Sequence, residues 1–151
     1  MRRQQAIGYG VWGMGVVLLI LSLVGIDQAQ AASSVCAKDV CVSVEVVSEL
    51  LDMQKGLQGR EGLKENQGML FVFDTDDFHN FWMKDMKFAI DIIWVNNQYR
   101  IAAIAPSREP CAQDPCEVYA SSQKARYVLE VPAGFVLKHQ LRQGDVLKFN
   151  L

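Results

Sequence analysis

Two aromatic and two charged residues in the middle of the chain have side chains that could build a binding site. Trp82 and Lys84 lie two positions apart in an apolar segment, so on a strand they would share one face. Asp91 interrupts the apolar run 88–95, and a carboxylate is costly to bury without a partner. With Tyr119 these residues could form the floor of a small polar site with a stacking ring, which suits a sugar or a small metabolite.

The same residues also fit a structural role. Asp91 would then accept hydrogen bonds from backbone amides or pair with Lys84, our leading candidate for its partner, and Trp82 would lie in the core. We favour the structural role for Asp91. It predicts that removing the carboxylate destabilises the fold, whereas a ligand-binding Asp91 could be removed with little loss of stability.

Glu130 is a second carboxylate within a predicted strand, 126–131, in which apolar and polar residues alternate. Two carboxylates that flank a glycosidic bond can hydrolyse it, so Asp91 and Glu130 suggest a small hydrolase or carbohydrate-active enzyme as the alternative function. Nothing in the sequence brings the two residues together, and we expect Glu130 to face outward. We therefore favour a non-enzymatic module that binds a small ligand or a partner.

The sequence has few features of metal or nucleic-acid binding. The two histidines, His79 and His139, are not spaced with carboxylates as metal ligands are, so we expect no metal and no cofactor. The net charge of −2 and the lack of a basic run exclude the positive surface that nucleic-acid-binding proteins use. The expected partner is a small molecule or a protein, and we expect a monomer.

The four cysteines form two similar pairs, Cys36 with Cys41 and Cys111 with Cys116. In an exported protein an even number of cysteines indicates disulfides, and Pro115 suits a tight turn inside the second pair. We therefore expect two local disulfide bonds. Four thiolates could instead bind zinc, since the spacing does not exclude such a site, although an oxidising compartment argues against it.

Residues 1–31 have the pattern of a secretory signal peptide: a basic start, an apolar stretch, and small residues at Ala29 and Ala31 that suit cleavage. Cleavage would leave residues 32–151 as a single β-rich globular domain. If the segment were retained, residues 6–26 would be long enough to anchor the chain in a membrane. Both alternatives place the domain in the periplasm or otherwise outside the cytoplasm, with membrane contact only through this segment.

Apolar patterning predicts many short strands separated by turn residues. The expected strands are 40–47, 69–73, 81–83, 88–95, 99–105, 126–131 and 146–151. A short helix should follow the capping residue Ser48, and 135–141 should make two helical turns. Residues 74–77 should form a polar turn and 106–117 a loop. The pattern is typical of a mostly β fold of the α+β class, a compact antiparallel β-barrel or sandwich with one or two short helices.

From about Val42 to Leu151 the chain resembles a known family, domain of unknown function 192. The resemblance rests on the order and spacing of short stretches: Lys55-Gly56-Leu57, 68–73, 81–84, 91–93, Tyr119 with Ser121, 127–130, Ala133-Gly134 and Gly144-Asp145. This chain has Gln58 where the family usually has methionine, and Asp85 where it usually has asparagine. The resemblance implies a compact β-rich fold that is often exported, and it implies no particular activity.

Overall fold

The computed structural model describes residues 33–151. The expected signal peptide, residues 1–31, and the alternative membrane anchor, residues 6–26, lie outside the described residues. Neither helix in the described part of the chain has the length and apolar character needed to cross a membrane.

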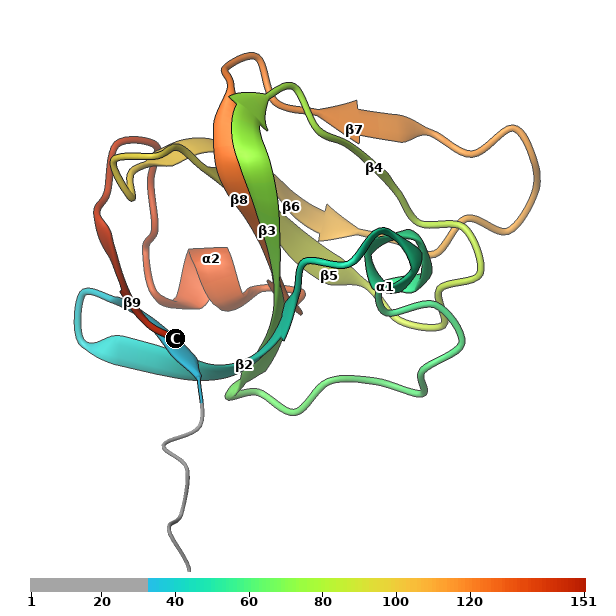
Figure 1. The fold of residues 1–151 in the computed structure, drawn as a ribbon. Coiled ribbons are helices and arrows are strands. Elements are labelled where there is room, and N and C mark those ends of the chain that lie inside the picture. The colour runs from blue at the N-terminus through green and yellow to red at the C-terminus, as the bar shows by residue number, and fades with distance from the viewer. Residues whose placement is uncertain (1–32) are drawn as a thin grey trace, which may run out of the picture. The chain divides into compact units, whose positions relative to one another are not determined.

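Residues 33–151 form nine strands and two short helices. In chain order these are β1 (Ser34–Ala37), β2 (Val40–Val47), α1 (Leu50–Lys55), β3 (Gln67–Asp77), β4 (Asn80–Trp82), β5 (Ile90–Val95), β6 (Ile101–Arg108), β7 (Val118–Ala120), β8 (Ala125–Pro132), α2 (Phe135–Lys138) and β9 (Leu147–Asn150). Seven strands make one sheet in the order β6-β5-β8-β3-β2-β1-β9, and β4 and β7 form a separate two-stranded sheet (Figure 1).

The seven-stranded sheet curls into a half-barrel, which confirms the predicted mostly β fold with two short helices. Neighbouring strands run antiparallel, except that β2 and β3 are parallel and are joined through α1. Backbone hydrogen bonds from Leu147 N–H to the Tyr99 carbonyl (2.8 Å) and from Ile101 N–H to the Asp145 carbonyl (2.9 Å) join the two ends of the sheet. These bonds hold the curl.

Apolar side chains cover both faces of the sheet. On one face Ile93 and Leu129 belong to a cluster that includes the buried residues of α2. On the other face Ile92 and Val128 pack in a cluster with Met83, which follows β4. Figure 1 shows α2 on one side of β3 and β8, and α1 with β4 on the other side. Because both faces are covered, every residue of β5 is buried.

Two strands are longer than their apolar patterns predict. The expected polar turn at 74–77 is wrong, because β3 continues past an irregularity in its pairing and Asp77 pairs with Ala125 of β8. Strand β6 continues through Pro106 to Arg108, into the expected loop 106–117. Bulges of this kind let a strand with polar residues continue to pair after its regular register ends.

The helices are shorter than expected. Helix α1 begins after Glu49, so Ser48 is not the capping residue, and it ends at Gly56, whose φ of 48° suits a residue without a β-carbon. Helix α2 is a single turn, whereas the sequence suggested two turns over 135–141.

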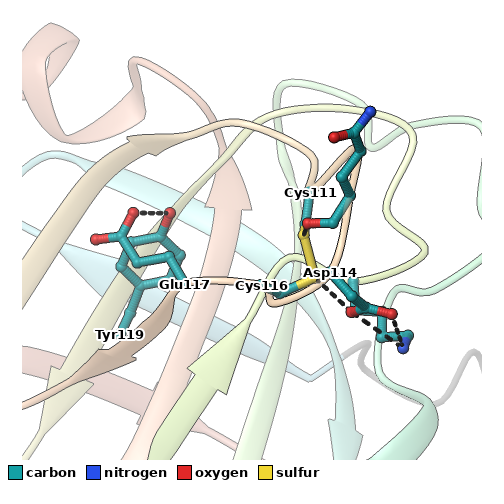
Figure 2. The surroundings of a disulfide bond; sticks show 7 residues. Cys111, Asp114, Cys116, Glu117 and Tyr119 are labelled. Carbon is teal, nitrogen blue, oxygen red and sulfur yellow. Dashed lines mark hydrogen bonds and ion pairs between the residues drawn. A yellow bond between two sulfur atoms is a disulfide. The ribbon is translucent and has the colours of Figure 1, made fainter.

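The cysteines are paired locally. Cys36 and Cys41 lie opposite each other in the β1–β2 hairpin, and their sulfur atoms are 2.09 Å apart. Cys111 and Cys116 are bonded at 2.10 Å in the loop between β6 and β7 (Figure 2). Each bond thus closes a short segment of chain.

Candidate functional site: a groove between α1 and β4

Asp91, on which the binding and structural interpretations differ most, lies on β5 and is 0 % exposed. Its Oδ1 accepts hydrogen bonds from the backbone N–H groups of Ser107 (2.7 Å) and Gly134 (3.1 Å), and its Oδ2 accepts one from Val136 (2.7 Å). The carboxylate therefore joins β5 to β6 and to the first turn of α2. Asp91 thus has the structural role, with backbone amides as its partners. The prediction that Lys84 is its partner was wrong.

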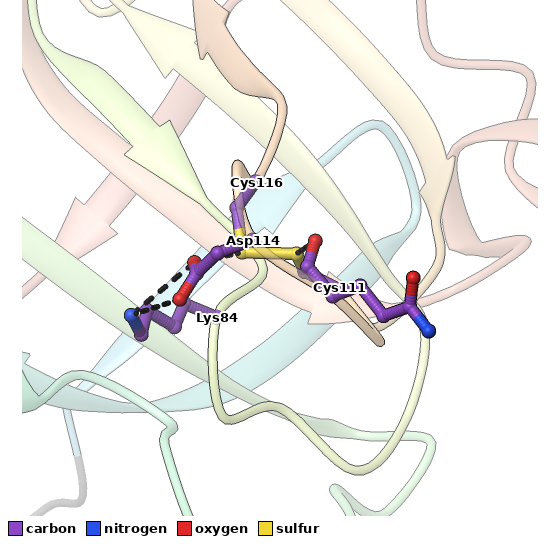
Figure 3. A network of polar contacts seen from close by, with 5 residues as sticks. Lys84, Cys111, Asp114 and Cys116 are labelled. Carbon is purple, nitrogen blue, oxygen red and sulfur yellow. Dashed lines mark hydrogen bonds and ion pairs between the residues drawn. A yellow bond between two sulfur atoms is a disulfide. The ribbon is translucent and has the colours of Figure 1, made fainter.

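Lys84 pairs instead with Asp114, in the loop that the second disulfide closes. Its Nζ lies 2.9 Å from Oδ2 and 3.2 Å from Oδ1 of Asp114 (Figure 3). The same loop is attached to the chain after β4 by a hydrogen bond from Cys111 N–H to the Met83 carbonyl (2.9 Å). The hydrogen bond to Asp114 raises the pKa of Lys84 above its ordinary value.

Tyr119 lies on β7, opposite Phe81 of β4. Its hydroxyl donates a hydrogen bond to Glu117 (3.0 Å), as Figure 2 shows, and the guanidinium carbon of Arg108 lies 5.0 Å from the centre of its ring. Burial, and then the bond to Glu117, raise the pKa of Tyr119. Both the ring and the hydroxyl of Tyr119 thus have partners within the protein.

Trp82 and Lys84 do lie together, on a groove between α1 and β4 that encloses about 700 Å³. We call it the α1–β4 groove. Its lining comes from α1 and the turn after it, from β3 and the turn that follows, from β4 and the next turn, and from one residue of β8. The lining residues are Leu50, Met53, Gln54, Lys55, Gly56, Leu57, Gln58, Phe71, Phe73, Phe78, His79, Asn80, Phe81, Trp82, Lys84, Asp85, Met86 and Glu130.

Aromatic rings form much of the wall of the α1–β4 groove. Phe71 and Phe81 meet edge to face with ring centres 5.0 Å apart, and Phe73 stacks on the ring of His79 at 3.4 Å. Trp82 is 53 % exposed, so the interpretation that placed it in the core was wrong. Packed rings give a rigid wall, and the exposed indole adds a ring face at the edge that a ligand can contact.

Glu130 is a buried carboxyl group at the α1–β4 groove. It is 5 % exposed, so the expectation that it faces outward was wrong. Within residues 33–151, its Oε2 has no hydrogen-bond partner. Burial raises the pKa of Glu130 to about 8, and the charge of Arg60 opposes that rise. A carboxyl group with this pKa is mainly protonated at pH 7.

Arg60, in the loop after α1, is held by a different carboxylate. Its Nη1 lies 2.8 Å from Oε2 of Glu45 on β2, and its Nη2 lies 2.9 Å from Oε1. This two-point contact matches the planar fork of a guanidinium to a carboxylate, and it occupies the group that could otherwise have neutralised Glu130.

The two carboxylates proposed for hydrolysis lie on opposite faces of the sheet. In the β5–β8 register Asp91 pairs with Val131, and Ile92 pairs with Glu130. Because successive residues of a strand point to opposite faces, Glu130 faces α1 and β4 while Asp91 faces α2. The structure therefore brings Trp82 and Lys84 together with Glu130, and it brings neither Asp91 nor Tyr119 to the groove.

Sequence reasoning named Glu130 as a candidate for hydrolysis but did not predict its burial, and it missed most of the aromatic wall. A signal for Glu130 was present: on alternation it shares a face with Val128, which is fully buried. The aromatic wall had a weaker signal. Phe71 and Phe73 were expected in a buried strand, and nothing in their spacing indicated that they would meet Phe81.

Comparison with known proteins finds uncharacterised relatives. The model of a family described as Uncharacterized ACR, DUF192, matches residues 33–149. A UPF0127 protein of Thermococcus gammatolerans is 24% identical over 91 residues, which cover 57% of this chain and 54% of that protein. This chain thus spans about half the length of the curated relative that it matches.

Two crystal structures share the fold. One is of a protein from Sinorhizobium meliloti 1021 described as a candidate transcription regulator, with a TM-score of 0.70, 23% identity, and coverage of 78% of this chain and 91% of that one. The other is of a protein of unknown function from Novosphingobium aromaticivorans, with a TM-score of 0.69, 24% identity, and coverage of 77% and 82%. At 23% and 24% identity, the similarity of these two structures to this chain shows a shared fold only.

Proposed function

The chain belongs to the DUF192 family of uncharacterised proteins, so its function has to be inferred from its own structure. We propose that the protein is a non-enzymatic module that binds a small molecule in the α1–β4 groove. The observation that carries the proposal is the size and lining of the groove. Its volume of about 700 Å³ lies in the range of small-molecule sites, which are mostly apolar with a few polar groups. Glu130 supplies such a polar group.

A hydrolase that uses Asp91 or Glu130 has less support. Hydrolysis of a glycosidic bond by a pair of carboxyl groups requires both to flank that bond, roughly 5–9.5 Å apart. Asp91 faces α2, and its two oxygens accept three backbone hydrogen bonds. Glu130 lines a groove with a large aromatic and apolar surface, and a single carboxyl group in such a groove suits a residue that orients a ligand.

We also propose that the module works outside the cytoplasm, in the periplasm or a similar compartment. Two bonded cysteine pairs support this, because disulfides persist in oxidising compartments. The signal-like pattern of residues 1–31 agrees with it. Intact-mass measurement of the full chain expressed in a bacterial host tests the proposal: we expect a mature protein that begins at Ala32. A full-length mass in the membrane fraction would instead indicate an anchor.

A thermal-shift screen with a library of amines, sugars, metabolites and cell-wall fragments tests the binding function. A ligand at a hundred times its Kd stabilises the folded state by about 2.7 kcal/mol, which is easily measured. Two neighbouring residues of α1 provide matched variants: Leu50 lines the groove and is 69 % exposed, whereas Leu51 is 78 % exposed and does not line it.

We expect ligands found with the wild type to shift Leu51→Ser equally and to shift Leu50→Ser and Trp82→Ala less. Both substitutions on α1 replace an exposed side chain, so they should change the stability of the unliganded protein by similar small amounts. Ligand shifts that are the same in all four proteins would place binding elsewhere and would refute the groove as the site.

A further inference from the structure

We propose that the ligand of the α1–β4 groove is an organic amine in its ammonium form, attached to an apolar chain or ring. This inference rests on the binding function proposed above and names the chemistry of its ligand. The ammonium group donates hydrogen bonds to Glu130, and the apolar part lies along the aromatic wall.

The first observation is that Glu130 lacks a partner. It is 5 % exposed, and Oε2 accepts no hydrogen bond from any group within residues 33–151. Buried polar groups in native proteins are nearly always hydrogen-bonded, so an unpartnered carboxyl oxygen at the edge of a cavity indicates that a ligand completes the site. A ligand that presents a donor to this oxygen would complete its hydrogen bonding.

The second observation is that two cations near the groove, Arg60 and Lys84, already have partners. Arg60 contacts both oxygens of Glu45, and Lys84 contacts both oxygens of Asp114. The pKa of Glu45 is lowered, chiefly by the hydrogen bond from Arg60 and to a smaller extent by the charge of Lys55. Lys55, in the last turn of α1, thus also acts on Glu45. Within residues 33–151 no salt bridge joins Glu130 to a cation, and the charge that acts on its pKa is that of Arg60. The ammonium group of a ligand would supply a direct partner.

The third observation is the chemistry of the wall. The faces of aromatic rings carry negative potential and attract organic cations, and recognition of ammonium groups by aromatic cages uses this attraction. Phe71, Phe73 and Phe81 surround the inner part of the groove, and Trp82 and Phe78 stand at its exposed edge. Through their faces such rings attract an ammonium group, and they also cover its apolar chain.

Pairing with an ammonium group requires Glu130 to ionise, so binding releases one proton to the solvent. With a pKa of about 8 in the empty groove, the apparent affinity should rise about tenfold for each unit by which the pH increases toward 8, and it should level off above that pH. The other ionisable groups of the lining are Lys55, His79, Lys84 and Asp85, and the charge of Arg60, outside the lining, also acts on Glu130. Burial lowers the pKa of His79, so its ring stays neutral above pH 7.

Three probes of similar shape test the inference: phenethylamine, 2-phenylethanol and 3-phenylpropionate, titrated by calorimetry between pH 5.5 and 8.5. The first is a cation throughout this range, the second is neutral and the third is an anion. We expect phenethylamine to bind at least about tenfold more tightly than the alcohol at pH 8, because its hydrogen bond to Glu130 is charge-assisted. Its binding should also release a proton at pH 6.

Two variants and one control variant locate the effect. Glu130→Gln keeps the shape of the side chain, and in it the preference for the cation and the pH dependence should both disappear. Trp82→Ala should weaken binding of phenethylamine without changing the pH dependence, and Leu51→Ser should behave as wild type. Circular dichroism of each variant establishes that it is folded.

The outcomes separate the inference from the proposed function. Tighter binding of the cation that is lost in Glu130→Gln supports both. If the alcohol binds as tightly as the amine, and Leu50→Ser weakens both, the amine inference is wrong and the proposed function stands. If none of the three probes binds, the inference is refuted, and the library screen decides the proposed function on its own.

Discussion

Replacement of Asp91 by alanine should destabilise the protein strongly. The carboxylate is 0 % exposed and accepts hydrogen bonds from Ser107, Gly134 and Val136, at 2.7, 3.1 and 2.7 Å. Alanine removes the acceptor for all three N–H groups. These groups belong to β6 and to the beginning of α2, so the substitution affects three elements that meet on one face of the sheet.

The size of the effect follows from these three bonds. A buried donor that loses its acceptor costs about 1–3 kcal/mol, and hydrogen bonds to charged groups lie at the upper end of this range. Some of the stranded amides can reach water after local relaxation, so we expect Asp91→Ala to lose at least about 3–5 kcal/mol. Asp91→Asn keeps one oxygen but turns an NH₂ group toward an N–H donor, and we expect a loss of about 2–3 kcal/mol.

Urea denaturation of wild type, Asp91→Asn and Asp91→Ala measures the effect, with the m-value as a check that the unfolding transition is unchanged. Asp74→Ala is the matched control, because Asp74 is an exposed aspartate on β3, and its loss should stay within about 0.5 kcal/mol of zero. An Asp91→Ala midpoint like that of the control, with the same m-value, would refute the structural role.

Three further predictions concern other parts of the fold. Burial raises the pKa of Glu130 from 4.5 to about 8, so between pH 4.5 and pH 8 the folded state binds a proton that the unfolded state has lost. The wild type should therefore lose about 3–5 kcal/mol of stability as the pH rises from 4.5 to 8. Glu130→Gln should remove this loss in denaturation at pH 5 and pH 8, and an equal loss in the variant would contradict the assignment. A β-carbon at Gly68 would lie 2.7 Å from the Glu130 carbonyl, so Gly68→Ala should lower stability by about 1–3 kcal/mol in thermal unfolding, while Gly62→Ala, with nothing within 4 Å, should not. Non-reducing peptide mapping should find Cys111 joined to Cys116, and replacing both by serine should cost about 2 kcal/mol; a cross-link from either to Cys36 or Cys41 would show a different pairing.

Several features of the fold could be predicted because they depend on local pattern. The alternation Val42, Val44 and Val46 predicted strand β2, and the run at 88–95 predicted the buried strand β5. The apolar neighbours of Asp91 indicated that its carboxylate needs partners. Which groups those partners are depends on where α2 and β6 pack, so the sequence could not distinguish the backbone amides from Lys84.

The candidate site could be predicted only in part. Trp82 and Lys84 are two positions apart on one chain segment, so their common face was readable from the sequence. The burial of Glu130 and the pairing of Asp114 were not predicted, because each residue acquires its environment from elements distant in the chain. Glu130 is covered by α1 and β4, and Asp114 pairs with Lys84, 30 positions away in the segment after β4.

The sequence by itself determined the class of fold, most of the strands and the need of Asp91 for partners, because these follow from short-range alternation and from the free energy of burying a charge. Only the tertiary structure decided which face of each strand is covered. An alternating strand such as β8 normally has one face in water, but here α1 and β4 cover the second face and bury Glu130. The α1–β4 groove exists because segments far apart in the chain meet over that second face, and no local pattern encodes such a meeting.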